Sequence, residues 1–311
     1  MNYFFVIIGI ALLIFGGELL VRGAVSLAVR LKVSTLLIAL TIIAFGTSTP
    51  ELLVSIDAAL SGSPELTIGN IIGSNIANVL LILGLPAILT PIFLSNTNPR
   101  DLIILISAYL LLVLFALNNE IIPYEGIILF IFLLFFLILS YQKGKKDRDT
   151  SDSLSNEVNS LSSSKKIPWI IFFIIIGIIL LFFGSDFLIK GAVGIAKQFN
   201  VPKEIIGLSV LAIGTSLPEL TTSIIAAIKK QNDFIIGNVI GSNIFNTLGV
   251  AGITSFLIPI PVKPSLLEFD FIIMFLSILC LIPLILFKIK IGRIIGSIFF
   301  SLYILYIIII F

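Results

Sequence analysis

The chain has no histidine, a single cysteine and few charged residues, and each shortage excludes a class of chemistry. Without histidine there is no imidazole to relay protons or to bind a metal ion. The one cysteine, Cys280, lies in an apolar run, so the chain alone cannot form a disulfide framework or a thiolate metal site. Any cation that this protein binds must therefore be held by oxygen ligands.

Charged residues make up only 12% of the 311 residues, whereas hydrophobic residues make up 58%. Soluble domains carry about 25% charged residues. Apolar runs of about 20 residues, the length that crosses a bilayer core, follow one another almost end to end. We therefore predict an all-α membrane protein and no enzyme, since no phosphate-binding loop or nucleophile–base pair appears. The net charge of +2 gives no reason to expect nucleic acid as a partner, and the expected surroundings are the lipid bilayer.

Polar and turn-rich points divide the chain into ten expected spans. No basic group precedes the first apolar run, which we therefore expect to be a retained span rather than a cleaved signal. Residues 143–166 are rich in Ser, Asp and Lys and are expected to form a flexible connector. Most Lys and Arg residues fall on the connector's side, so the positive-inside rule predicts a cytoplasmic connector and extracellular termini in the cell membrane. The expected spans are 3–29, 33–60, 67–90, 101–118, 122–141, 167–189, 203–228, 234–258, 269–287 and 292–311.

The sequence repeats itself at a constant offset of 168 residues. Gly-Thr-Ser-Thr-Pro-Glu at 46–51 returns as Gly-Thr-Ser-Leu-Pro-Glu at 214–219, and Gly-Asn-x-x-Gly-Ser-Asn at 69–75 returns at 237–243. Each half, 1–142 and 167–311, holds five spans, and this odd number means that the second copy enters the membrane from the opposite side. Inverted repeats with helix breakers at matching positions indicate a secondary transporter with its site between the halves. A repeat of small-residue packing motifs is the alternative, but packing alone would not need the same carboxylate twice.

The two repeated glutamates are the centre of a candidate cation site. A carboxylate inside a span costs about 2.5–3.5 kcal/mol, so such a residue usually faces a cavity, a partner or an ion. The prolines before the glutamates are expected to leave nearby backbone carbonyls without helical partners. Hydroxyl and amide oxygens on the same helix faces complete an all-oxygen shell of the kind that Ca²⁺ prefers, although any one Ser or Thr could instead serve helix packing. The candidate ligands are Glu51, Glu219, Thr47, Thr215, Ser48, Ser216, Ser74, Ser242, Asn78 and Asn246, with the carbonyls of Ala44 and Ala212.

Other charged residues in the spans carry weaker signals. Glu18 and Arg22 are four residues apart, as are Asp186 and Lys190, so each pair is expected to form an ion pair within one helix. A role of these pairs in opening and closing an ion path is the alternative. Asp57 has no acidic counterpart in the second repeat and is expected at a solvated helix end, with a place at the entrance of an ion path as the alternative.

The paired motifs resemble the two alpha repeats of the cation/calcium exchanger superfamily, specifically its compact prokaryotic and archaeal sodium/calcium exchangers. The resemblance covers essentially the whole transmembrane region. It implies ten helices in two inverted halves, with Ca²⁺ and Na⁺ as transported substrates that share Glu51 and Glu219. It also implies that the hydroxyls and carbonyls named above complete the sites, and that the long first and sixth helices slide to expose them to each side in turn. No cofactor and no obligatory protein partner is expected.

Asn246 departs from the family pattern, because some archaeal members carry aspartate there and potassium-dependent relatives also place an acid. Because its side chain is neutral, K⁺ cotransport is less expected. The two glutamates are then the only charged ligands expected. Two carboxylates balance one Ca²⁺, whereas three Na⁺ leave one surplus positive charge, so a three-to-one exchange would be electrogenic. The remaining alternatives are a proton/calcium antiporter, in which the glutamates take up protons, another divalent cation exchanger of the same superfamily, and a channel with an acidic selectivity ring.

Overall fold

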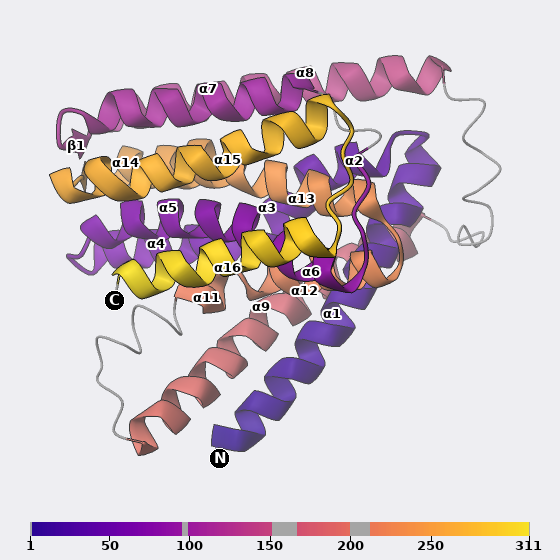
Figure 1. The fold of residues 1–311 in the computed structure, drawn as a ribbon, viewed down its shortest axis with the longest axis horizontal. Coiled ribbons are helices and arrows are strands. Elements are labelled where there is room, and N and C mark those ends of the chain that lie inside the picture. The colour runs from indigo at the N-terminus through magenta and orange to yellow at the C-terminus, as the bar shows by residue number, and fades with distance from the viewer. Residues whose placement is uncertain (1, 95–98, 151–166, 200–211, 311) are drawn as a thin grey trace.

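The computed structural model describes residues 2–94, 99–150, 167–199 and 212–310, and almost all of them are helical (Figure 1). The first half consists of α1 (Asn2–Leu31), α2 (Thr35–Ile38), η1 (Ala39–Ile43), α3 (Ala44–Thr47), α4 (Thr49–Leu60), α5 (Glu65–Leu80), α6 (Gly84–Leu89), α7 (Pro99–Ala116), β1 (Glu120–Ile121) and α8 (Pro123–Thr150). The second half consists of α9 (Ile167–Gln198), α11 (Ala212–Thr215), α12 (Leu217–Ile228), α13 (Asn232–Ile244), η4 (Phe245–Val250), α14 (Ala251–Leu257), β2 (Ile260–Pro261), η5 (Leu266–Asp270), α15 (Phe271–Leu286) and α16 (Arg293–Ile310). The elements labelled η are π-helical.

The expected spans agree with the observed helices. Within the described ranges, nine helical segments are long and apolar enough to cross a membrane. The tenth expected span, 203–228, begins outside the described residues and continues as α11 and α12. Two boundaries differ most. Helix α9 continues to Gln198, beyond the expected end of its span at 189. Helix α8 continues past its apolar part to Thr150, so residues 143–150 of the expected connector are helical. The rest of the connector lies outside the described residues.

Reciprocal contacts between the halves confirm the inverted repeat. A Cβ atom at Gly84 in α6 would lie 3.0 Å from the carbonyl oxygen of Gly296 in α16, and one at Gly126 in α8 would lie 2.7 Å from that of Gly252 in α14. Gly252 is the repeat counterpart of Gly84, so one helix contact occurs twice. Two short backbone pairings also occur once in each direction between the halves. Ile92 pairs with Ile291, and its repeat counterpart Ile260 pairs with Ile121. Helices of each half thus pack mainly against helices of the other, and the fold is two interlocked five-helix repeats.

Helices α1 and α9 form a separate antiparallel pair that crosses the other helices at a steep angle (Figure 1). Their backbones come close at glycines spaced seven residues apart, a spacing that keeps one side of a helix facing its partner. A Cβ atom at Gly16 would lie 2.9 Å from the carbonyl oxygen of Gly177, and one at Gly184 would lie 2.8 Å from the amide nitrogen of Leu13. Small residues allow this approach, which is how membrane helices gain van der Waals contact without a hydrophobic driving force. The glycines of this contact are Gly9, Gly16, Gly23, Gly177, Gly184 and Gly191.

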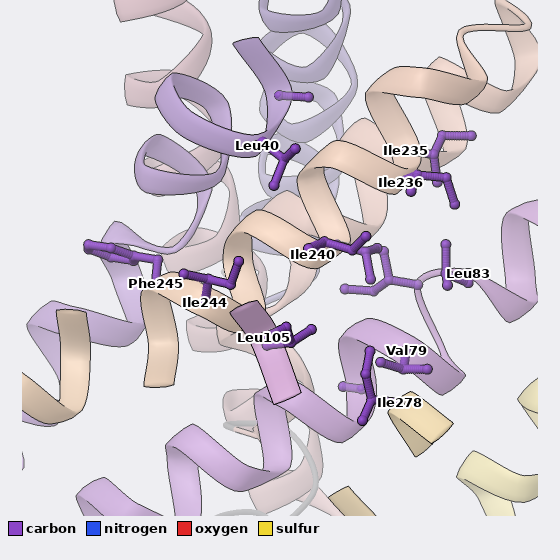
Figure 2. Packing of buried hydrophobic residues seen from close by; sticks show 14 of the residues in the cluster. Leu40, Val79, Leu83, Leu105, Ile235, Ile236, Ile240, Ile244, Phe245 and Ile278 are labelled. Atoms are coloured by element: carbon purple, nitrogen blue, oxygen red, sulfur yellow. The ribbon is translucent and has the colours of Figure 1, made fainter. Parts of the chain in front are cut away.

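The centre of the fold is the continuous segment of α13, η4 and α14, in which an entire 18-residue window is buried inside the protein. Glycines again allow close packing, because a Cβ atom at Gly241 would lie 2.4 Å from the carbonyl oxygen of Leu40 in η1. Figure 2 shows Leu40 together with Ile240, Ile244 and Phe245 in the surrounding layer of hydrophobic side chains. The central helices are therefore held rigidly on all sides, which favours a precisely shaped polar site beside them.

Replacing Gly16 with alanine is expected to destabilise the protein by about 1–3 kcal/mol, the usual cost of overpacking. The new methyl group would press on the backbone of α9, which cannot move aside as a side chain can. Thermal unfolding in detergent, followed by size-exclusion chromatography, measures the change. Gly69→Ala is the matched control, because a Cβ atom at this helical glycine has no atom within 4 Å and alanine favours the helix. Equal stability of the two variants would contradict the close α1–α9 contact.

Candidate cation-binding site

The helix is interrupted for one residue, two positions before each repeated proline. Ser48 separates α3 from α4 and has φ −87° and ψ 9°, and Ser216 separates α11 from α12 with φ −86° and ψ 5°. Proline is tolerated in the first turn of a helix because the amide hydrogen that it lacks would have no helical partner there. Glu51 and Glu219 therefore lie in the first turn of a new helix rather than in the middle of an uninterrupted span. The positive end of the helix dipole stabilises a carboxylate at that position.

The two glutamates meet at the interface between the repeats through reciprocal hydrogen bonds. The Ser48 hydroxyl donates to Oε1 of Glu219 at 2.9 Å, and the Ser216 hydroxyl donates to Oε1 of Glu51 at 3.5 Å. Both carboxylates are 1% exposed. Each serine precedes the glutamate of its own repeat by three residues but binds the glutamate of the other. The two halves thus share one site, and neither half contains it alone.

Several oxygen atoms around these carboxylates are buried without a hydrogen-bond partner. They include the second oxygen, Oε2, of both glutamates. A buried polar atom with no partner costs about 1–3 kcal/mol, and more when it is charged, unless something else binds it. A cation bound among these oxygens would remove that cost and balance the two negative charges. The other unpartnered oxygens among the candidate ligands are the hydroxyls of Ser74 and Ser242, Oδ1 of Asn78 and Oδ1 of Asn246.

The backbone carbonyls differ from the expectation in one respect. Ala44 keeps a helical partner, since its carbonyl accepts the Ser48 amide at 3.0 Å. A carbonyl oxygen has a second lone pair, so Ala44 can still be a cation ligand. Proline removes the donor for the carbonyl four residues earlier, which is Gly46 for Pro50 and Gly214 for Pro218. The Gly214 carbonyl accepts the Ser185 hydroxyl of α9 instead. Ala212, the counterpart of Ala44, begins the short helix α11.

The two candidate threonines are buried beside the helix interruptions at Ser48 and Ser216. Thr215 ends α11 and is 5% exposed. Thr47 ends α3, and its hydroxyl lies 3.2 Å from Oδ1 of Asn238 on α13. This contact joins a candidate ligand of the first repeat to the central helix of the second.

Sequence reasoning named Asn78 but left out Asn75 and Asn243, which help to connect α5 with the second repeat. Asn75 donates to the Thr247 hydroxyl at 2.9 Å, and Asn78 donates to Oδ1 of Asn243 at 2.9 Å. Asn78 thus has its nitrogen occupied and its oxygen available as a ligand. Asn246 lies in η4, whereas its counterpart Asn78 lies in the α-helix α5, and Asn246 has no partner at either amide atom. The signal for these residues was present, because Asn75 and Asn243 belong to the repeated motif.

The expected intrahelical ion pairs are present, and one of them has a further partner. Arg22 binds Glu18 within α1, and Lys190 binds Asp186 at 2.7 Å within α9. Lys229, the residue that ends α12, also binds Glu18, at 2.8 Å. Its repeat counterpart is Ser61, which has no charge. An ion pair therefore ties α1 to α12, and sequence alone cannot reveal such a contact between distant segments.

No group of three or more acidic, histidine or cysteine side chains that could hold a metal occurs in the part of the chain that the structure describes. Among the candidate ligands, only Glu51 and Glu219 carry a charged side chain. Asp57 is exposed on α4, as expected for a solvated position.

A largely apolar cavity of about 220 Å³ lies between α9 and the helix interruption of the first repeat. It reaches Thr47 and the two prolines that precede the glutamates. On the α9 side its wall consists of aliphatic and aromatic side chains, including Ile178 and Phe182. In the second repeat, by contrast, α1 packs directly on α12, since a Cβ atom at Gly17 would lie 2.6 Å from Ile225. The α1–α9 pair thus covers the two halves of the site unequally.

Comparison with known proteins gives the family of the chain. Residues 1–142 and 169–311 match the family model described as sodium/calcium exchanger protein. The chain is 39% identical to the putative antiporter CaxA of Alkalimonas amylolytica over 82% of this chain and 80% of that protein. It is 29% identical to the sodium/calcium exchanger MaX1 of Methanosarcina acetivorans over 86% of each chain.

A solved structure of the sodium-calcium exchanger NCX_Mj has the same fold, with a TM-score of 0.81 at 30% sequence identity. The match covers 100% of this chain and 99% of that one. The family model and the structural match both extend over nearly the whole chain. The chain therefore belongs to the sodium/calcium exchanger family, in its compact archaeal and prokaryotic form.

Proposed function

We propose that this protein exchanges Na⁺ for Ca²⁺ across the cell membrane by alternating access, with Glu51 and Glu219 as shared ligands. The observation that carries the proposal is the reciprocal pair of Ser–Glu hydrogen bonds, which leaves one unpartnered oxygen on each buried carboxylate. Hard cations prefer such an all-oxygen environment. The proposed ligands are Glu51, Glu219, Thr47, Thr215, Ser48, Ser216, Ser74, Ser242, Asn78 and Asn246, with the carbonyls of Ala44 and Ala212.

Antiport follows from competition for the same two carboxylates. Ca²⁺ and Na⁺ cannot both use Glu51 and Glu219 fully, so binding of one ion favours release of the other. Two carboxylates neutralise one Ca²⁺, whereas three Na⁺ leave the site with one positive charge. We therefore propose an exchange of about three Na⁺ for one Ca²⁺, which moves one net charge per cycle.

The α1–α9 pair is the proposed moving part. Its two helices are joined backbone to backbone through their glycines, so they can move as one unit. It meets the interruptions beside the site largely through apolar side chains, since a Cβ atom at Gly46 or Gly214 would press on Ile178 or Ile189 of α9. Apolar contacts are not directional, so these can slide past one another. The Ser185–Gly214 hydrogen bond and the Lys229–Glu18 ion pair are the directional contacts that such a movement would have to break. In the proposed orientation both termini are extracellular and the 143–166 segment is cytoplasmic.

Proteoliposomes loaded with Na⁺ and diluted into Na⁺-free buffer are expected to take up radioactive Ca²⁺. Glu219→Gln should lower this uptake to about 1% of wild type or less, since breaking a buried charged contact costs about 3–5 kcal/mol. Glu120→Gln is the matched control, because it makes the same change at an exposed residue of β1. Uptake driven equally well by a proton gradient without Na⁺ would instead establish a proton/calcium antiporter. Ca²⁺ flux that needs no internal counter-ion at all would indicate a channel.

The proposed stoichiometry predicts that membrane potential changes the rate of Ca²⁺ uptake. When three Na⁺ leave for each Ca²⁺ that enters, one positive charge leaves the vesicle, so an inside-positive potential should accelerate uptake. The potential can be set with K⁺ gradients and valinomycin while the Na⁺ gradient is held constant. Uptake that is independent of potential would mean an electroneutral exchange of two Na⁺ per Ca²⁺.

The two serines are expected to contribute unequally to Ca²⁺ binding. Ser48→Ala removes the shorter hydrogen bond, and a bond to a charged group contributes about 1.5–3 kcal/mol, or roughly 10- to 100-fold in affinity. Ser216→Ala removes the longer bond and should weaken Ca²⁺ binding less. Calorimetric titration of the purified protein in Na⁺-free buffer measures both dissociation constants. An equal loss in the two variants would show that the difference of 2.9 against 3.5 Å has no functional consequence.

A further inference from the structure

Asn238 has a buried side-chain amide beside the proposed site but is not one of the proposed ligands. It lies on the central helix α13 and is 0% exposed. Both ends of its amide have neighbours from other helices. Oδ1 accepts from the Thr47 hydroxyl at 3.2 Å, and Nδ2 donates to the Thr222 hydroxyl at 3.5 Å. Asn238 therefore lies between a proposed ligand of the first repeat and the helix that carries Glu219.

The orientation of this amide is determined by Thr222. The single hydroxyl proton of Thr222 is directed to backbone carbonyls of its own helix, those of Pro218 at 2.8 Å and Glu219 at 3.0 Å. Only its lone pairs then face Asn238, so the amide must present its N–H₂ group to Thr222. The amide oxygen consequently faces Thr47. The reverse orientation would place an oxygen against the Thr222 lone pairs and an N–H₂ group against Thr47.

With a cation bound to Glu219, the amide oxygen decides where the Thr47 proton points. The Glu219 carboxylate is itself a hydrogen-bond partner of Thr47. A cation bound there would occupy the carboxylate, which leaves Oδ1 of Asn238 at 3.2 Å and the carbonyl of Ala44 at 3.4 Å as the acceptors. The Ala44 carbonyl already accepts the Ser48 amide, so Asn238 is the closer and less occupied acceptor. A cation binds the lone pairs of a hydroxyl and is repelled by its proton. Thr47 is thus a good ligand when Asn238 takes its proton, and the Ala44 carbonyl keeps a lone pair for the same ion.

The counterpart of Asn238 in the first repeat makes different contacts. Asn70 donates to the backbone carbonyl of Glu51 at 3.2 Å and to the Ser55 hydroxyl at 3.0 Å. The position equivalent to Thr222 is Val54, which has no hydroxyl to orient an amide. Asn70 therefore holds the backbone of its own repeat, whereas Asn238 acts across the repeat interface. One repeated residue has two different tasks.

We propose that Asn238 is a positioning residue, which turns the lone pairs of Thr47 toward the transported ions and thereby selectively strengthens Na⁺ binding. The inference rests on the proposed function. The charge of Ca²⁺ is balanced by both carboxylates, so the loss of one hydroxyl among its roughly six to eight oxygen ligands should weaken its binding least. Several Na⁺ ions in one site repel each other and must spread out, so some of them depend on hydroxyl and carbonyl oxygens such as those of Thr47 and Ala44.

The test compares the Na⁺ and Ca²⁺ dependence of Asn238→Leu, a substitution of similar size that removes the acceptor. We expect the Na⁺ concentration for half-maximal exchange to rise about two- to tenfold, the effect of losing one hydrogen bond. The Ca²⁺ dissociation constant in Na⁺-free buffer should change less than about twofold on the same scale. A merely structural role would weaken both ions together.

A double-mutant cycle separates action through Thr47 from other effects. In a Thr47→Val background, Asn238→Leu should cause no further rise in the Na⁺ requirement, because the hydroxyl that it orients is gone. Thr222→Val provides a variant that keeps Asn238 and Thr47 but frees the amide to turn. It should raise the Na⁺ requirement in the same direction, even if Asn238→Leu fails to fold.

The outcomes distinguish this proposal from the one on which it rests. Loss of Na⁺-driven Ca²⁺ uptake in the wild-type protein would overturn the proposed exchange itself. Normal wild-type exchange with equal shifts for Na⁺ and Ca²⁺, an unchanged Na⁺ requirement in Thr222→Val, or additive effects in the cycle would each overturn the role of Asn238 alone.

Discussion

Two carboxylates buried in a membrane protein impose the constraint from which the rest of this structure follows. Hydrocarbon supplies no water to solvate them, so donors, helix dipoles or ions must do so. The chain supplies a proline-started helix for each glutamate and a serine hydroxyl from the opposite repeat. These contacts satisfy only one oxygen of each carboxylate. The charge that remains makes the site suited to cations, and the buried helices α5 and α13 isolate it from lipid.

Pseudo-symmetry shares this site between the halves, but the sequence does not keep the two faces equal. The helix contacts of Gly84 and Gly252 are faithful copies of each other. Around the α1–α9 pair, however, Lys229 ties α1 to α12, whereas the equivalent Ser61 cannot pair with Asp186. A symmetric exchanger would hold its two access states at equal free energy. Differences of this kind allow one state to be favoured without any change at the carboxylates.

The sequence predicted the parts of the fold that depend on local pattern. Hydropathy gave the spans, the 168-residue offset gave the inverted repeat, and four-residue spacing gave the ion pairs of Glu18 and Asp186. It could not assign partners across helices. Ser48 binds Glu219 rather than the glutamate beside it, and Thr47 contacts Asn238, 191 residues away. Such pairings depend on how whole helices pack, as does the π-helical backbone around Asn246, so neither follows from a one-dimensional pattern.

The interlocking of the repeats has a consequence for how the protein is made. During synthesis the first half enters the membrane before Ser216 and α9 exist, so Glu51 lacks its hydroxyl donor and α1 lacks its glycine-lined partner. Helices α6 and α8 likewise lack their close-packed partners, α16 and α14, at that stage. The newly inserted half is therefore an open assembly with an unsatisfied charge. Neither half therefore completes its close helix contacts or its buried hydrogen bonds until the other half is in place.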